Sequence, residues 1–210
     1  MQMGPTTGDF PKTGRLYVPD FEIDLGLTNR VELDIDGSLT VEPLRTAPAQ
    51  LMFGEPLWTA AKLGFFDVKN EGPTRSAALG MQLGPRLSIG PNTPRGVGYG
   101  ALLLGAADFG PARIVLNAGG MADATYGGHA LGFMNGVNLW FDIGEAGKWG
   151  LVGNGSYAHY FTVLPDQLTF TAGVGYDGED VDWSVSALAS PIGDDRVGIL
   201  LGCSPRFHLY

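Results

Sequence analysis

The residues with the clearest chemical potential are acidic and follow a period of two along residues 20–36. Six carboxylates alternate with Phe, Ile and Leu: Asp20, Glu22, Asp24, Glu32, Asp34 and Asp36. In an extended strand, residues of one parity point to one face. A three-residue loop at 27–29 would set Asp24 opposite Glu32, and the two outer pairs would follow. A shift of two residues in this register keeps all six carboxylates on one face.

Like charges placed directly opposite each other destabilise a strand pair, so this cluster requires compensation. One interpretation is a wall that attracts cations, in which carboxylates share protons or bind Ca²⁺. The other is a salt-bridged interior completed by Lys62, Arg86 or Arg113 from other strands. We favour the second interpretation, since narrow barrels fill their interiors with such side chains. Either way, the six carboxylates, Arg86 and Arg113 are predicted to line the interior, and we expect no resident metal or other cofactor.

No pattern in the sequence predicts a catalytic site, and we expect a protein that is not an enzyme. The three histidines have no ligand spacing, and Ser156 and His159 differ in parity, so they point to opposite faces. Ser204 and His208 share a face but lie about 13 Å apart along a strand. A lipid-hydrolysing enzyme formed by cross-strand pairing remains an alternative. Cys203, the only cysteine, can form no internal disulfide.

The elements that would position these residues are strands. Alternation of apolar and polar residues recurs along the chain, and Gly and Pro interrupt nearly every window long enough to be a helix. Eleven strands are predicted, many of them longer than the usual five or six residues: 16–27, 30–42, 56–67, 76–89, 97–109, 112–123, 130–143, 149–163, 167–177, 181–190 and 197–209. A tilted strand that crosses a membrane needs about 9–11 residues.

Composition supports a strongly curved sheet and limits the partners. Glycine supplies 33 of 210 residues, scattered among apolar residues, which is typical of bends and close approaches in curved sheets. The net charge of −9 argues against nucleic acid as a partner. No apolar run is long enough for a membrane helix, although a membrane protein built from strands remains allowed.

Period two alone cannot tell which face of the sheet is inside. The apolar face could contact lipid around a polar interior, or it could form the core of a soluble barrel. We favour lipid contact, because charged residues make up only 17% of the chain and soluble surfaces normally carry more. Aromatic residues near predicted strand ends, where membrane barrels carry aromatic girdles, agree with this choice: Tyr17, Trp149, Tyr176, Trp183 and Phe207.

Strand number constrains the N-terminus. Eleven is the wrong parity for a bacterial barrel with both ends in the periplasm, so we expect about twelve strands, with ten as the alternative. The twelfth would precede residue 16, but residues 1–15 are rich in Gly and Pro and predict a tail or a partial strand. Met1–Gly4 has neither segment of a signal peptide, and an N-terminal piece, including one strand, is expected to be missing. Residues 16–210 are predicted to form a single barrel domain.

Several segments resemble a family of outer-membrane barrels. Pro19 to Leu33, which contains Gly-Leu-Thr-Asn-Arg and a Glu-Leu strand, is similar to the opening hairpin of the MetA-pathway of phenol degradation family, whose members are often labelled "transporter". Residues 55–64, 96–104 and 110–117 are similar to later strands of that family, and the likeness covers about three quarters of the chain. The resemblance implies an outer-membrane barrel that passes or binds small hydrophobic compounds, with no defined substrate.

We therefore expect an antiparallel transmembrane β-barrel in the outer membrane of a Gram-negative bacterium. Its partners would be the lipid bilayer and a small-molecule solute, and its acidic lumen wall would give a cation preference if it conducts. Two alternatives stay open. One is a structural barrel with a plugged lumen that binds envelope proteins, and the other is a soluble lipocalin-like barrel that binds a hydrophobic ligand.

Overall fold

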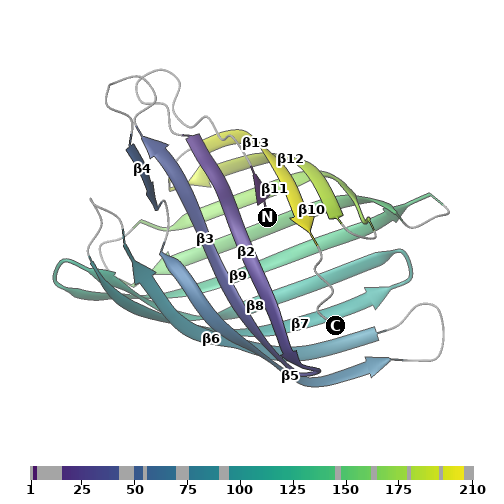
Figure 1. The fold of residues 1–210 in the computed structure, drawn as a ribbon, viewed down its shortest axis with the longest axis horizontal. Coiled ribbons are helices and arrows are strands. Elements are labelled where there is room, and N and C mark those ends of the chain that lie inside the picture. Colours follow the sequence, from purple (N-terminus) through teal and green to yellow (C-terminus); the bar gives the residue numbers. More distant parts are fainter. Residues whose placement is uncertain are drawn as a thin grey trace.

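The computed structural model is all-β (Figure 1). It describes residues 2–3, 16–42, 50–53, 56–69, 76–89, 95–144, 148–161, 165–178, 181–193 and 196–205. None of these residues belongs to a helix that is long and apolar enough to cross a membrane. The strands are β1 (Gln2–Met3), β2 (Leu16–Thr28), β3 (Val31–Glu42), β4 (Gln50–Phe53), β5 (Leu57–Lys69), β6 (Ser76–Ser88), β7 (Gly96–Phe109), β8 (Ala112–Thr125), β9 (Gly128–Ile143), β10 (Trp149–Tyr160), β11 (Gln167–Tyr176), β12 (Val181–Ile192) and β13 (Arg196–Pro205).

Eleven of these strands form an antiparallel meander in which each long strand pairs with the next one along the chain, in the order β2-β3-β5-β6-β7-β8-β9-β10-β11-β12-β13. All eleven strands expected from the alternation are present, so the all-β antiparallel prediction is confirmed. The short strand β4 pairs with the far end of β3. The meander strands are 10 to 16 residues long, which is long for a sheet.

The two ends of the meander approach each other through β1. Gln2 lies opposite Gly202 of β13 and opposite Asp20 of β2, and Met3 lies opposite Leu201. In the described ranges β2 and β13 have no direct pairing, so the sheet curls without closing into a barrel by a full-length strand pair. Within residues 1–15 the described residues are those of β1, which lies between the first and last strands of the meander.

The connections alternate between two ends of the curled sheet. At the turn end, as we name it, lie the two-residue turns Asn29–Arg30 and Gly110–Pro111, the latter with a φ of 64° at Gly110 that suits glycine. At the opposite loop end lies the long connection between β3 and β5. Among the described residues the loop end also has a two-residue turn, at 126–127, so short connections occur at both ends.

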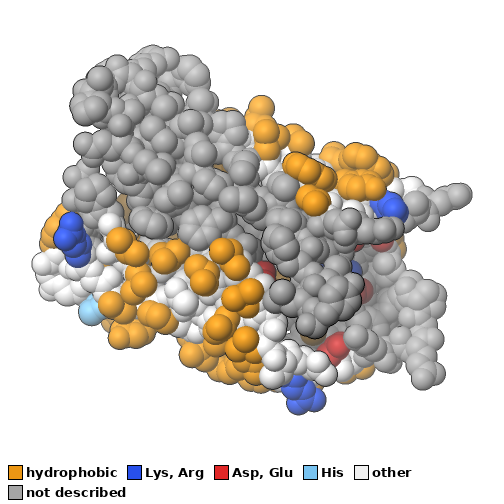
Figure 2. All heavy atoms as spheres, in the orientation of Figure 1, with side chains coloured by type: hydrophobic (Ala, Val, Ile, Leu, Met, Phe, Trp, Pro, Cys, Tyr) orange, Lys and Arg blue, Asp and Glu red, His pale blue; other side chains and the backbone are white. Residues whose placement is uncertain are grey.

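The two faces of the sheet differ in polarity, and the apolar face is the exposed one. Along β12, Trp183 and Val185 are exposed whereas Ser186 and Ser190 are buried. More than thirty large hydrophobic side chains are exposed across the described chain, while the buried hydrophobic residues are only Trp58, Ala60, Leu102, Met121 and Ala130. Hydrophobic side chains spread over the described surface in Figure 2. The interior of the curled sheet is thus the polar side.

Candidate binding cavity inside the curled sheet

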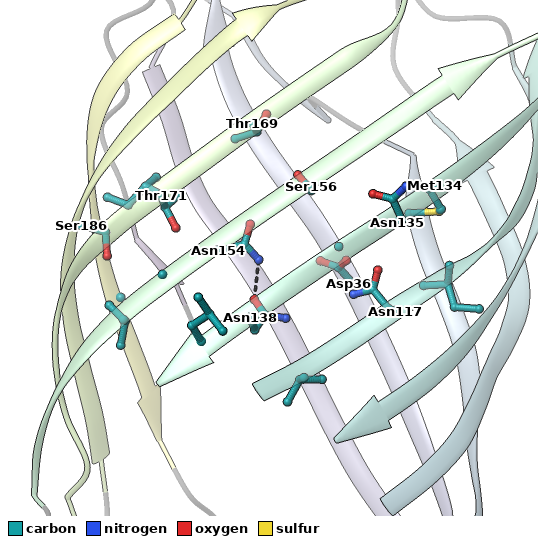
Figure 3. Close-up of a pocket in the computed structure, with 18 of the residues that line it drawn as sticks. Asp36, Asn117, Met134, Asn135, Asn138, Asn154, Ser156, Thr169, Thr171 and Ser186 are labelled. Atoms are coloured by element: carbon teal, nitrogen blue, oxygen red, sulfur yellow. Dashed lines mark hydrogen bonds between the residues drawn. The ribbon is translucent and has the colours of Figure 1, made fainter. Parts of the chain in front are cut away.

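The curled sheet encloses a cavity of about 1020 Å³. Polar side chains from β8 to β12 surround it, as Figure 3 shows. Among the charged residues that the sequence assigned to the interior, the lining contains Asp34, Asp36, Arg86 and Arg113. The cavity lies at the upper end of the ~300–1,000 Å³ range of small-molecule sites. Its size and its polar lining make it the candidate functional site.

The first hairpin has a different register from the expected one. Asp24 lies opposite Asp34 and Glu22 opposite Asp36, two residues away from the expected pairs. The cause is the turn: Asn29 and Arg30 form it, and the register shifts between Gly26 and Thr28, which leaves one extra residue in β2. The side chains of Asp20 and Glu22 lie outside the described residues.

Lys62 on β5 contacts three of the carboxylates from this hairpin. Its Nζ lies 2.7 Å from Asp24, 3.3 Å from Glu32 and 3.6 Å from Asp34. Asp34 is 1% exposed and also accepts a hydrogen bond from the amide of Gln82 on β6. The carboxylates therefore form an ion-paired layer against the wall, which is the arrangement of the salt-bridged interpretation.

Arg86 and Arg113 form ion pairs with carboxylates outside that layer. Arg113 Nε lies 2.9 Å from Asp108 at the turn end, and the Arg113 side chain is mostly exposed. Arg86 Nε donates to Asp123 Oδ1 at 2.6 Å near the loop end. The interior charges thus divide into local pairs instead of one acidic wall.

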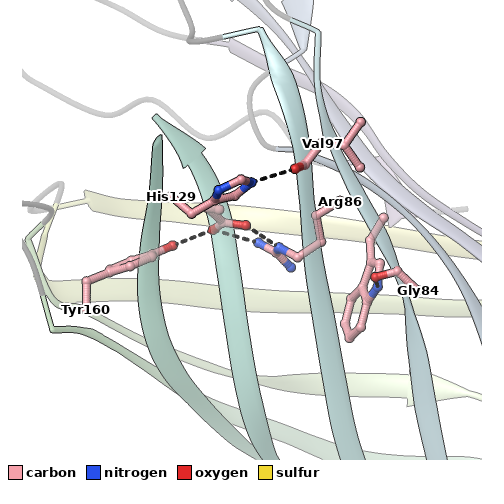
Figure 4. Close-up of polar contacts among 7 residues, drawn as sticks. Gly84, Arg86, Val97, His129 and Tyr160 are labelled. Atoms are coloured by element: carbon pink, nitrogen blue, oxygen red, sulfur yellow. Dashed lines mark hydrogen bonds and ion pairs between the residues drawn. The ribbon is translucent and has the colours of Figure 1, made fainter. Parts of the chain in front are cut away.

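The Arg86 pair belongs to a cluster that links four strands (Figure 4). Tyr160 on β10 donates its hydroxyl to Asp123 on β8 at 2.8 Å, and the Arg86 guanidinium lies 5.4 Å from the ring centroid of Trp58 on β5. The Trp58 indole donates to the carbonyl of Gly84 at 3.3 Å. Sequence reasoning missed Asp123 and Tyr160, although each shares parity with inward-facing residues of its own strand.

A neutral wall completes the cavity. We use this name for the inward-facing amides and hydroxyls of the central parts of β9 to β12, which carry no Asp, Glu, Lys or Arg: Asn138, Asn154, Ser156, Thr169, Thr171, Ser184, Ser186 and Ser190. The Asn154 amide donates to Asn138, as the dashed line in Figure 3 marks. Ser190 shares a hydrogen bond of 2.7 Å with Thr169. Because these side chains are uncharged and scattered over four strands, nothing in the sequence pattern marks them as a site.

Trp140 lies at the turn-end edge of the neutral wall. Its indole Nε1 donates to Asp142 at 2.6 Å. A Cβ atom on Gly175 would lie 2.6 Å from the Trp140 ring, and one on Gly150 would lie closer still. Because both glycines lack a side chain, the ring can lie flat against the inner surface of β10 and β11. Asp142, Asp177 and Asp182 are the nearby carboxylates at this end.

The exposed face carries an aromatic row at the turn end. Trp149, Tyr176 and Trp183 lie directly opposite one another on β10, β11 and β12, and the rings of Trp149 and Tyr176 are 4.9 Å apart. Trp149 is 55% exposed and Trp183 is 56% exposed. These are three of the five aromatic residues expected near strand ends. The side chains of Tyr17 and Phe207 lie outside the described residues.

Three polar side chains, those of Tyr157, His159 and Asp166, contact one another on the exposed side near the loop end. Asp166, just before β11, accepts hydrogen bonds from the Tyr157 hydroxyl at 2.7 Å and contacts His159 Nδ1 at 2.8 Å. The Tyr157 hydrogen bond, helped by His159, holds the pKa of Asp166 below its usual value. Ser156 instead lines the cavity, so the structure does not bring Ser156 and His159 together.

Within the described residues, no group of three or more His, Cys, Asp or Glu side chains is arranged to hold a metal ion. Comparison with models of known protein families and with characterised proteins gave no match to this chain.

Proposed function

We propose that this protein is a transmembrane β-barrel of the bacterial outer membrane whose interior binds and passes small molecules. In this proposal the ring closes through β1, which lies between β13 and β2. The pairs that Gln2 makes with Gly202 and Asp20 support that closure, because one residue already contacts both ends of the meander.

The observation that carries the proposal is the reversed burial of the two faces. In water, burying apolar side chains in a core is favourable by about 25 cal/mol of free energy per Å² of apolar surface. Here Leu103, Val185 and Ile199 are more than half exposed, while Asp34, Gln82 and Asp123 are buried. A hydrocarbon environment around the sheet removes this conflict, since it favours the exposed apolar side chains.

Two further features support a membrane location. The meander strands of 10 to 16 residues are long enough for tilted strands to cross a bilayer, which requires about 9–11 residues. The row of Trp149, Tyr176 and Trp183 lies at one end of the exposed face, where aromatic side chains meet the membrane–water interface. A soluble lipocalin-like barrel would place these apolar residues inside.

A structural barrel with a plugged lumen is the second candidate, and the interior ion pairs favour it. The Lys62 group and the Arg86 group both occupy space on the inner wall. However, the cavity of about 1020 Å³ beside them argues for a binding or passage role. Because Lys62 lies within ion-pair distance of Asp24, Glu32 and Asp34, the cation preference expected of a conducting barrel should be weaker than that of an unpaired acidic wall.

The proposal is tested by insertion and then by transport. The protein, refolded in detergent, is added to preformed lipid vesicles that are floated on a density gradient and then used in a solute-driven swelling assay. We expect co-flotation with the lipid and swelling in small neutral solutes. A chain that stays monodisperse in buffer without detergent and does not float would contradict membrane insertion. Flotation without swelling would favour the structural barrel.

A further inference from the structure

We infer that the neutral wall, with Trp140 beside it, is a binding site for short neutral saccharides. This inference deepens the proposed function and rests on it, because it names the class of molecule that the interior takes. It differs from the small hydrophobic compounds that the family resemblance implies. Three independent features of the described residues lead to it: the chemistry of the wall, the position of Trp140, and the state of the charges opposite.

The wall offers the kind of hydrogen-bonding groups that suit sugar hydroxyls. Amide and hydroxyl side chains both donate and accept, and so does each hydroxyl of a sugar. Asn154 and Asn138 share one hydrogen bond, which fixes both amides on the wall and leaves the Asn138 NH₂ group and the Asn154 carbonyl oxygen for a ligand. Thr171 lies directly beside Asn154 on β11, so it adds a hydroxyl to the same row. A hydrophobic ligand would leave these groups without partners, which is unfavourable.

Trp140 supplies an apolar platform next to these groups. It follows Asn138 by two residues on β9, so both side chains point inward and are neighbours. Its indole is held at one edge by the hydrogen bond to Asp142, and its ring lies over Gly150 and Gly175. One ring face is thus covered by backbone and the ring borders the cavity. The negative face of an aromatic ring attracts the C–H groups of a sugar ring packed flat against it.

The basic side chains on the opposite wall are already ion-paired, which disfavours an anionic ligand. Lys62 is within ion-pair distance of three carboxylates, Arg86 pairs with Asp123, and Arg113 pairs with Asp108. An anionic ligand would have to compete with the carboxylates that these three cations already contact. A neutral molecule with many hydroxyls can bind without breaking these ion pairs. The cavity is large enough for more than one sugar ring with bound water.

The experiment measures binding by isothermal titration calorimetry of the folded, full-length protein in detergent. The probes are maltotriose, cellotriose and the trisaccharide of N-acetylglucosamine, with phenol as the small hydrophobic comparison. We expect saturable binding of at least one trisaccharide and no saturable binding of phenol. Trp140→Ala and Asn154→Ala should each raise Kd about tenfold, which corresponds to ~1.4 kcal/mol. The matched control, Trp149→Ala on the exposed face, should leave Kd unchanged.

A second variant separates a positioning effect from loss of the platform. Gly175→Ala removes neither the indole nor any hydrogen-bonding group of the wall. Its methyl group would clash with the Trp140 ring and displace it, so this variant should also weaken trisaccharide binding. Circular dichroism and the vesicle flotation assay establish that each variant is folded and inserted. Phenol binding without trisaccharide binding, or equal Kd values for Trp140→Ala and Trp149→Ala, would overturn the inference. If flotation succeeds and no trisaccharide binds, the membrane proposal stands and only this inference fails. If trisaccharides bind but the chain does not float, the membrane proposal fails and this inference stands.

Discussion

Lys62 Nζ lies 2.7 Å from Asp24 Oδ1, although β5 and β2 are not neighbouring strands. The whole of β3 separates them, and the long lysine side chain reaches across it while also contacting Glu32 and Asp34. The Lys62 side chain therefore links β2, β3 and β5, the first three long strands of the meander, through ion pairs. This contact explains how a hairpin with so many carboxylates on one face can fold.

Replacing Lys62 should destabilise the protein strongly. In Lys62→Met the carboxylate of Asp34, which is 1% exposed, loses its cation and stays buried, so we expect a loss of about 3 kcal/mol in unfolding free energy. The measurement is urea unfolding in lipid vesicles followed by tryptophan fluorescence. The control is Arg113→Met, whose exposed ion pair with Asp108 should be worth less than about 1 kcal/mol. Equal losses for the two variants would show that Lys62 does not have this role.

Within the cluster around Arg86, substitution of Asp123 should reduce stability the most. It accepts from both Arg86 and Tyr160, so Asp123→Ala removes the ion pair with an Arg86 side chain that is 12% exposed and should lower the unfolding free energy by about 3 kcal/mol. Tyr160→Phe removes the hydrogen bond to Asp123 and keeps the Arg86–Asp123 ion pair, and a loss of about 1.5 kcal/mol is expected. The same unfolding assay ranks the two variants. The reverse order would contradict the central position of Asp123.

An arginine scan along β7 should depend on depth. Leu103, in the middle of the strand, and Phe109, at its turn end, are both exposed on the apolar face. In vesicles, Leu103→Arg should lose about 2–4 kcal/mol and Phe109→Arg about 0–1 kcal/mol, because the cost of a charge is highest at the bilayer midplane. If both variants lose little, the apolar face does not contact hydrocarbon.

Acid should release the loop-end contact at Asp166. The pKa of this carboxyl in the folded protein lies below its usual value of 3.8, since Tyr157 and His159 both favour the ionised form. Its contribution to stability is therefore complete above about pH 4 and is lost as the pH falls through the lowered pKa. Tyr157→Phe should raise the pKa of Asp166, as measured by NMR titration of the carboxyl carbon. Tyr99→Phe, an exposed tyrosine on β7, is the control and should leave that pKa unchanged.

Much of the fold could be predicted because alternation is a local property. Every long strand of the meander, including β6 with its Leu79–Leu83 apolar parity, is readable from a period of two. The register of the first hairpin was not predictable in the same way. The two-residue turn at Asn29 and Arg30, together with the extra residue near Leu27, shifts every cross-strand pair by two residues from the register that a three-residue loop would give.

The candidate site shows the limit of reading charges from the sequence. The inward parity of Asp34 and Arg86 was visible, but their partners depend on strands far apart in the chain, such as β6 with β8. Asn138 and Asn154 are ordinary polar residues in isolation. They become a candidate site only because the register of β9 and β10 sets them opposite each other beside Trp140.

The central claim is that lipid surrounds the apolar face and water fills the polar interior. A nitroxide scan along β12 tests it directly, with one spin label at a time from Trp183 to Ser190 in vesicles and Cys203 replaced by Ser. We predict that oxygen accessibility peaks at 183, 185, 187 and 189, whose side chains are exposed in the structure. Accessibility to a water-soluble nickel chelate should be lowest at those same positions. Peaks of nickel accessibility at 183, 185, 187 and 189 would contradict the claim.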